Sequence, residues 1–361
     1  MLRVHLLTEP ANNQNTVAFL TPIVWTRARL RRTHGIDIEY FHAPTAPRFG
    51  ECDVVAINSK IWNGPWASRR AEALALIERI RSSGRRVVYF DRTSTPGAIT
   101  HEILAAVDRY SKTAAYADRA TYLRPVYSNR LFAEFYHDRD GIADDTPAQP
   151  LVLPNAADLA KVVIAWNTGL ATYGPFAPRI ASFHRFAPVR AVFLPPQTFP
   201  SPRRPRAVAV SCRVGQNYRY ATVAHQRREV AKLLSDRAPT DWVGRMAYFR
   251  ELARSRIVAS PFGFSEINYR DFEAFRYGAV LLKPDMSHLE TWPDYFRADR
   301  TYVAHAWDLS DVTEKVDAIL GDPDRALEIA TAGQALYRHH AASDAGHAEF
   351  AARFAALVSQ W

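Results

Sequence analysis

The chain has 361 residues, 48% of them hydrophobic and 23% charged, and its 46 basic against 37 acidic side chains give a net charge of +9. This length favours two domains, and the composition is that of a folded globular protein rather than a disordered one. The charge favours anionic partners such as phosphates, nucleic acid or a membrane face, although a surface on which arginine replaces lysine would give the same balance.

Three further features narrow the class of protein. The sequence has no run of about eighteen apolar residues, and the N-terminal stretch MLRVHLLTEP lacks the apolar core of a secretory signal. Cys52 and Cys212 lie in different halves beside apolar runs, so we expect buried thiols rather than a disulfide or a zinc site. The sequence therefore predicts a soluble, cytoplasmic protein.

The first half alternates strand-like and helix-like segments. Strands are expected at 2–8, 36–43, 52–57 and 85–91, and helices at 17–32, 68–84, 101–107 and 155–174, with an irregular stretch at 121–155. Because the two types alternate, the sheet should be parallel. This half, residues 1–195, is predicted to be one Rossmann-like domain.

A proline-rich segment at 193–206, FLPPQTFPSPRRPR, has no periodicity and is typical of an interdomain connection. Alternation then restarts with strands expected at 206–212, 257–260 and 279–284, and helices at 225–234, 271–278, 308–320 and 323–340. The segment 249–261 is expected to be a helix that leads into the strand 257–260. We predict a second Rossmann-like domain over 206–345 and a C-terminal helix at 346–361 that packs back on the first domain. The expected fold class is α/β, with two parallel sheets facing a cleft and ligands at the carboxyl ends of the strands.

The stretch 256–284 combines a strand, the loop PFGFSE, a helix and a second strand. Backbone N–H groups near Asn268 at the helix start favour an anion, and Gly263 would allow close approach to the backbone. Arg270 and Glu273 are three residues apart and share a helix face. A guanidinium suits a diphosphate and a carboxylate suits ribose hydroxyls, which indicates a nucleotide. The alternative is an ion pair on the helix surface.

This segment resembles the nucleotide-sugar region of glycosyltransferases with the two-Rossmann GT-B fold, in which a serine- and glycine-containing loop precedes an R-x-x-E-A-x-x-x-G helix. The matching residues are Arg270, Glu273, Ala274 and Gly278. Residues 205–345 look like the bacterial group-one-like enzymes, and are similar to the protein O-glucosyltransferase and capsule xylosyltransferase family in a strand ending in Leu-Lys followed by Tyr-Val-x-x-x-x-Asp-Leu-Ser-Asp. The first half matches in architecture only.

The resemblance implies that Glu273 holds the ribose and that Arg270, with Phe264, Ser265 and the loop amides, holds the diphosphate. In the retaining branch of the family two glutamates are separated by seven residues, whereas Glu266 and Glu273 are separated by six. The departure slightly favours an inverting reaction.

Three further residues could contact the donor. Arg213 and Gly215 follow a strand at a position where GT-B enzymes often touch diphosphate, and Lys283 ends another strand at the predicted cleft edge. The alternative for Arg213 is a solvent-facing loop arginine, and Arg227 is expected to be one.

An inverting transfer needs a base from the first domain. Asp91, at the end of the strand 85–91, is the first candidate, Glu9 after the first strand is the second, and Asp108 is the third. Asp91 could equally cap the following turn.

The sequence thus predicts a metal-independent glycosyltransferase with no cofactor, which moves a sugar from a nucleoside diphosphate to a hydroxyl, such as one on a bacterial surface glycan. The charge favours peripheral contact with the anionic inner membrane. Three alternatives stay open: a nucleotide-sugar epimerase of the same fold, a DNA-base glycosyltransferase, and a non-catalytic protein that retains the donor pocket. Nucleic acid is disfavoured because basic and aromatic residues do not cluster.

Overall fold

A six-stranded parallel sheet forms the N-terminal half, in the order β2-β1-β3-β4-β5-β7. The computed structural model describes residues 1–11, 13–62, 65–148, 151–171, 193 and 195–361. The elements of this half are β1 (Leu2–Leu7), α1 (Gln14–Thr33), β2 (Ile36–Phe41), β3 (Val54–Asn58), η1 (Ser59–Ile61), α2 (Trp66–Ser82), β4 (Arg86–Asp91), α3 (His101–Ala106), β5 (Arg109–Lys112), β6 (Ala114–Tyr116), η2 (Arg119–Leu123), η3 (Tyr127–Asn129), α4 (Leu131–Asp140), η4 (Ala156–Lys161) and β7 (Val162–Ile164).

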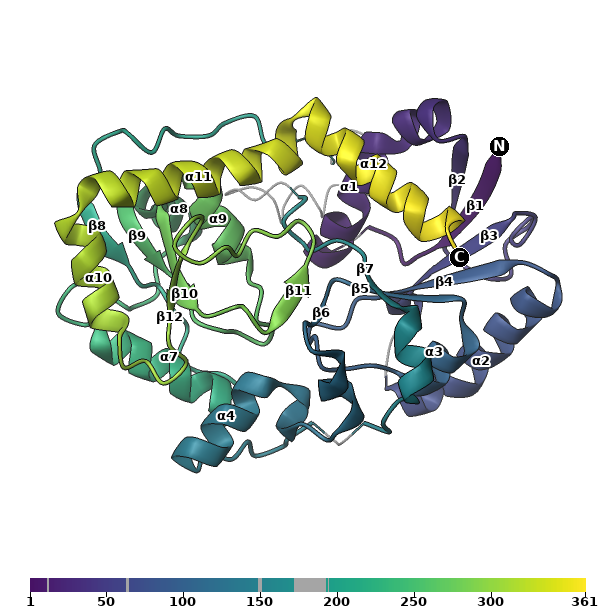
Figure 1. Cartoon of the computed structure of the whole chain (residues 1–361), viewed down its shortest axis with the longest axis horizontal. Coiled ribbons are helices and arrows are strands. Elements are labelled where there is room, and N and C mark those ends of the chain that lie inside the picture. The colour runs from purple at the N-terminus through teal and green to yellow at the C-terminus, as the bar shows by residue number, and fades with distance from the viewer. Residues whose placement is uncertain (12, 63–64, 149–150, 172–192, 194) are drawn as a thin grey trace.

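The C-terminal half contains a four-stranded parallel sheet in the order β12-β10-β9-β8. Its elements are β8 (Val208–Ser211), α7 (Ala221–Leu233), α8 (Arg245–Leu252), β9 (Ser255–Ala259), α9 (Tyr269–Tyr277), β10 (Val280–Pro284), β11 (Leu289–Thr291), β12 (Val303–His305), α10 (Val312–Gly321), α11 (Pro323–Ala342) and α12 (Asp344–Ser359). The two sheets with their covering helices lie side by side (Figure 1). This confirms the expected class of two Rossmann-like α/β domains.

Two segments differ from the sequence-based expectations. The helix predicted at 155–174 was wrong over its described part: a 3₁₀ turn leads into β7, whose Val162 pairs with Tyr110 of β5. A run of two valines and an isoleucine suits a buried edge of the sheet better than a helix. The stretch 121–155, expected to be irregular, contains the helix α4.

Segments of each half pack against the other half. α4 contributes Phe132 and Tyr136 to the hydrophobic core around β9 and β10, and in Figure 1 it lies beside α7. β6 pairs with β11 in an antiparallel ladder in which Tyr116 faces Leu289. These contacts fix the spacing between the two sheets. The predicted boundaries at 195, 206 and 345 stay a prediction.

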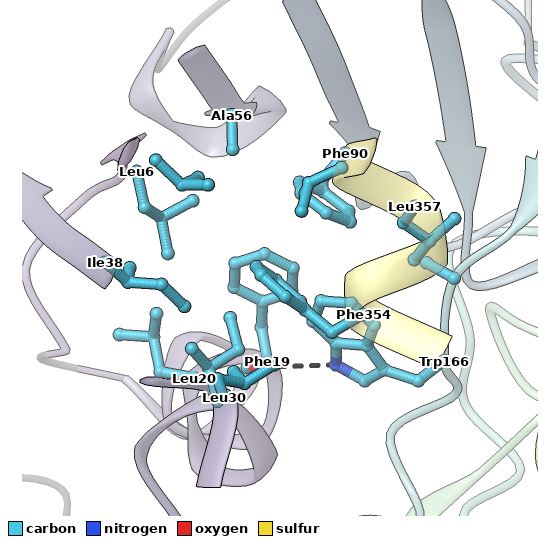
Figure 2. Packing of buried hydrophobic residues seen from close by; sticks show 14 of the residues in the cluster. Leu6, Phe19, Leu20, Leu30, Ile38, Ala56, Phe90, Trp166, Phe354 and Leu357 are labelled. Carbon is cyan, nitrogen blue, oxygen red and sulfur yellow. Dashed lines mark hydrogen bonds between the residues drawn. The ribbon is translucent and has the colours of Figure 1, made fainter. Parts of the chain in front are cut away.

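The C-terminal helix α12 crosses from the end of α11 to lie along α1 (Figure 1). Its Phe354 and Leu357 belong to the same buried cluster as Phe90 of β4 and Trp166 (Figure 2). Trp166 donates from Nε1 to the carbonyl oxygen of Phe19 at 3.2 Å, so its one polar atom is satisfied inside this core. Among the described residues, no helix is long and apolar enough to cross a membrane.

Candidate active site

α9 begins next to the carboxyl end of β9. Asp271 in its first turn accepts a hydrogen bond of 2.8 Å from the backbone N–H of Asn268, the N-cap residue. The other carboxylate oxygen of Asp271, Oδ1, accepts from the Ser260 hydroxyl, and Nζ of Lys283 lies 3.1 Å from Oδ2, the oxygen that accepts from Asn268. The start of α9 is therefore already occupied by a carboxylate of the chain, and its pull on an external anion is weaker than the sequence suggested.

Arg270 and Glu273 lie on one face of α9, and Tyr248 of α8 lies between them. The Tyr248 hydroxyl donates to Oε2 of Glu273 at 2.8 Å and accepts from Nε of Arg270 at 3.3 Å. Arg270 also donates to the carbonyl oxygen of Arg213. Since Glu273 is only 8% exposed, the alternative of an ion pair on the helix surface does not describe this arrangement.

The electrostatic state of this group follows from its burial. Burial raises the pKa of Glu273, and the hydrogen bond from Tyr248 and the charge of Arg270 oppose that rise only in part. Burial and the neighbouring Glu273 raise the pKa of the Tyr248 phenol well above its usual range, so Tyr248 stays a donor. A carboxylate held this way retains one oxygen for another hydroxyl.

These three side chains line a cavity of about 400 Å³ that we call the C-terminal pocket. Its lining residues are Arg213, Val214, Gly215, Tyr218, Arg227, Thr240, Trp242, Val243, Arg245, Tyr248, Ser260, Asn268, Tyr269, Arg270 and Glu273. Of the predicted contacts it thus brings together Arg213, Gly215, Asn268, Arg270 and Glu273. Among these lining residues Glu273 is the one carboxylate, and four are arginines.

The arginines of this pocket are held in place by protein acceptors. Arg213 donates two hydrogen bonds to Oε2 of Glu251, one of 2.8 Å from Nη2 and one of 3.0 Å from Nε. Arg227, expected to face solvent, is 5% exposed and donates to the carbonyl oxygens of Gly215 at 2.6 Å and Phe262 at 3.0 Å. Such fixed guanidinium groups are suited to a phosphate because they need little reorganisation on binding.

Sequence reasoning missed three aromatic residues of this pocket, Trp242, Tyr248 and Tyr269. Tyr248 gains its position only from the packing of α8 on α9, which no local pattern in the sequence reveals. Trp242 is 87% exposed at the pocket, which is unusual for so large an apolar ring. An exposed ring at the edge of a polar pocket can stack on a flat ligand.

A second cavity of about 420 Å³, the interdomain pocket, shares Tyr218, Asn268 and Tyr269 with the first. Its other lining residues are Asn15, Lys60, Arg92, Thr93, Ser94, Pro96, Thr113, Ala114, Asn167, Thr168, Phe264, Ser265 and Ile267. Both halves of the chain therefore line one continuous cleft, with Phe264 and Ser265 on this side rather than in the C-terminal pocket.

Gly263 and Lys283 do not line either pocket. A Cβ at Gly263 would stand 2.6 Å from Oδ1 of Asn268, so the space beside this glycine is filled by the chain itself rather than left for a ligand. Lys283 is completely buried and ion-paired with Asp271. These positions correct the predictions that Gly263 admits a ligand and that Lys283 contacts phosphate.

Two of the three predicted base candidates are placed where they cannot serve. Asp91 is 2% exposed, and it accepts from Lys112 at 2.8 Å, Tyr110 at 2.9 Å and the backbone of Thr93 at 2.8 Å. Burial by itself would raise the pKa of Asp91, but the charge and hydrogen bond of Lys112 together with the hydrogen bonds from Thr93 hold that pKa below its usual value. Asp91 lines neither pocket.

Asp108 lies at the amino end of β5, the opposite end of the sheet from the cleft. There it accepts from Arg86 at 2.8 Å and from the backbone N–H of Val87 at 2.8 Å. Glu9, by contrast, follows β1 at the carboxyl edge, accepts from Thr16, and lies 3.2 Å from Nη1 of Arg92, which lines the interdomain pocket. Glu9 is the candidate that the structure leaves next to the cleft.

Glu266 occupies an unusual environment between the two halves. It is fully buried, and neither carboxylate oxygen has a hydrogen-bond donor among the described residues. Burial raises the pKa of Glu266 to about 7. It lines neither pocket, although its neighbours Ser265 and Ile267 line the interdomain one.

One group of described side chains has the composition of a metal site. His339, His340 and Glu349 bring their ligand atoms within 4.8 Å of one another where α11 meets α12. Glu349 is already bonded to His339 at 2.8 Å. None of the three lines the cleft.

Residues 215–349 match the model of a family described as glycosyl transferase-like. Among solved structures the chain is similar to an alpha-glucosyltransferase in complex with UDP (8% identity, 94% of this chain and 96% of that one, TM-score 0.46). It is also similar to a sucrose-phosphate synthase from Thermosynechococcus elongatus (10% identity, 100% of this chain and 99% of that one, TM-score 0.44). A third similar structure is a glycosyltransferase from Rickettsia africae (9% identity, 100% of this chain and 99% of that one, TM-score 0.42). No curated protein matches the chain.

The fold and the pockets together define the class of structure: two Rossmann-like α/β domains with a polar cleft between them. The segment that matches the glycosyl transferase-like family contains α9 with Arg270 and Glu273.

Proposed function

We propose that the protein transfers a sugar from a nucleoside diphosphate sugar in the C-terminal pocket to a hydroxyl group in the interdomain pocket. The observation that carries this proposal is the group formed by Arg270, Tyr248 and Glu273 on the wall of the C-terminal pocket. A buried carboxylate with a free oxygen suits a ribose diol, and guanidinium groups nearby suit the diphosphate.

The nucleobase would stack on Trp242. Its ring lies exposed at the same pocket as Glu273. A base joined to a ribose held by Glu273 would be within reach of this ring, and stacking would remove apolar surface from water.

In the reaction, the acceptor oxygen forms a bond to the anomeric carbon of the donor while the bond from that carbon to the diphosphate oxygen breaks. The electron pair leaves with the nucleoside diphosphate, and the hydroxyl proton passes to a base. We assign the base to Glu9, from the N-terminal domain, which favours inversion. Its ion pair with Arg92 lies beside the interdomain pocket.

No metal ion or cofactor is part of this proposal, since arginines of the C-terminal pocket can neutralise the departing diphosphate. The resemblance to group-one-like and capsule enzymes suggests a growing bacterial surface glycan as the acceptor, built by a cytoplasmic protein. The net charge of +9 would favour contact with an anionic membrane face.

A thermal-shift screen of UDP, GDP, ADP, CDP and dTDP tests the donor assignment, because a ligand that binds only the folded state raises its melting temperature. We expect one nucleoside diphosphate to raise the melting temperature. Glu273→Ala should abolish this shift, whereas Glu314→Ala, at an exposed side chain of α10, should retain it.

Repeating the assay with EDTA tests whether nucleotide binding requires a metal ion. Incubation with the sugar nucleotide alone separates an epimerase, which would produce a new sugar nucleotide. A shift unaffected by Glu273→Ala would rule out this site.

The base is tested by comparing Glu9→Gln with the parent protein. If Glu9 removes the acceptor proton, transfer should fall by about 10²- to 10⁴-fold while the nucleotide-induced thermal shift persists. Unchanged transfer would exclude Glu9.

A further inference from the structure

The interdomain pocket has a charge pattern of its own. Two of its lining residues are cationic, Lys60 after β3 and Arg92 after β4, and none of its described lining residues is an aspartate or a glutamate. The rest of the polar lining consists of hydroxyl and amide groups. A site for a neutral sugar would not require this excess of positive charge.

Both cations have unused hydrogen-bonding capacity. Among the described residues the ammonium of Lys60 makes no hydrogen bond or ion pair; only its backbone N–H is bonded, to Oδ1 of Asn58 at 3.1 Å. The guanidinium of Arg92 has five N–H donors, and one contact, from Nη1 to Glu9 at 3.2 Å, is made within the described part of the chain. The Arg92 side chain is nevertheless 6% exposed.

The enclosure of the Arg92 side chain makes its small number of hydrogen bonds unusual. Burial lowers the pKa of Arg92, while Glu9 opposes the change. One face of the guanidinium packs on the Phe19 ring, with Cζ 4.9 Å from the ring centre. A guanidinium this enclosed normally satisfies most of its donors, and the remaining N–H groups of Arg92, which lines the pocket, are open to an acceptor bound there.

Under the proposed function, the diphosphate of the donor does not need Lys60 and Arg92, because four arginines line the C-terminal pocket where it binds. Lys60 and Arg92 both come from the N-terminal sheet, where the acceptor is expected to bind. Glu9 compensates part of the charge of Arg92, which leaves Lys60 uncompensated.

We infer that the acceptor substrate is itself an anion, a hydroxyl compound bearing a phosphate or carboxylate group held by Lys60 and Arg92. This inference rests on the proposed function, because it deepens the identity of the acceptor at the same cleft. Charge-assisted hydrogen bonds would fix the anionic group, and the hydroxyl and amide lining would orient the sugar or polyol.

The test uses the full chain, saturated with the nucleoside diphosphate found in the screen. Glucose, glucuronate and glucose 6-phosphate are titrated calorimetrically into the parent protein, Lys60→Gln, Lys60→Glu and the matched control Lys232→Gln, whose lysine is exposed on α7. We expect at least one acidic compound to bind about tenfold or more tightly than glucose in the parent and in the control. That preference should shrink to near unity in Lys60→Gln and disappear in Lys60→Glu.

Equal binding of glucose and both acidic compounds to the parent protein would overturn the inference, as would a preference that Lys60→Gln retains in full. Loss of nucleotide binding in Lys60→Gln would also overturn it, because Lys60 would then serve the donor. The proposed function fails separately, if no nucleoside diphosphate binds the parent protein at all.

Discussion

The phenol of Tyr248 donates a hydrogen bond of 2.8 Å to Oε2 of Glu273 and so connects α8 to α9. Tyr248→Phe would leave this buried carboxylate without its donor, at a cost of about 1–3 kcal/mol in the free energy of unfolding. Urea unfolding measures the loss. The same variant should bind the nucleoside diphosphate more weakly, since Glu273 would no longer be held toward the pocket.

Tyr277→Phe is the matched control for this change. Tyr277 ends α9, and its hydroxyl makes no hydrogen bond within the described part of the chain. The Tyr277→Phe protein should therefore unfold at nearly the same urea concentration as the parent protein. Equal stabilities of the two variants would contradict the role given to Tyr248.

Glu266 should make stability depend on pH. Burial raises its pKa from the usual 4.5 to about 7, so between these values the folded chain retains a proton that the unfolded chain has lost. The stabilising effect of the neutral carboxyl is complete below about pH 4.5 and is lost as pH rises to about 7. Glu266→Gln removes this loss and should be more stable than the parent protein at pH 8, by on the order of 3 kcal/mol.

The measurement is urea unfolding of both proteins from pH 4.5 to 8, with Glu314→Gln as an exposed control on α10. The difference between Glu266→Gln and the parent should grow over this window and then level off. A difference that is constant with pH would show that Glu266 does not titrate there.

The alternation of strands and helices along the chain is enough to predict the fold class, since buried apolar runs and glycine stops are local features. α4 and β7 were not recognised, because each owes its place to contacts with distant segments: α4 packs against the core of the other half, and β7 pairs with β5. Local propensity is weak where such tertiary contacts decide.

The site was predictable to a different extent. Arg270 and Glu273 followed from the spacing on one helix face, which tertiary structure preserves. Asp91 and Lys283 were placed at strand ends correctly, yet each side chain turns inward to a buried partner, Lys112 and Asp271 respectively. Which way a side chain points at the end of a strand depends on those partners, and they lie 21 and 12 residues away along the chain.

The buried pair of Asp271 and Lys283 gives a third prediction. Lys283→Met would leave the carboxylate of Asp271 buried without its cation and should cost about 3–5 kcal/mol in the free energy of unfolding. Adding Asp271→Asn should recover part of the lost stability, because the unpaired charge is removed. A double-mutant cycle in urea measures the coupling of the two side chains.

Nucleotide binding distinguishes this structural role from a phosphate contact. Any folded Lys283→Met protein should bind the nucleoside diphosphate with nearly the affinity of the parent, since Lys283 lines neither pocket. If the Lys283→Met protein had normal stability but did not bind the nucleotide, Lys283 would be a donor-binding residue after all.

Phe354 of α12 should contribute strongly to the stability of the N-terminal half. Its ring is completely buried, 6.1 Å from the ring of Trp166 and 6.4 Å from that of Phe90 (Figure 2). Phe354→Ala removes these contacts and leaves a cavity, so a loss of about 3–5 kcal/mol is expected from urea unfolding. Leu123→Ala, at a side chain that is 41% exposed, should cost much less. Similar losses in the two variants would mean that α12 is not a structural part of the N-terminal core.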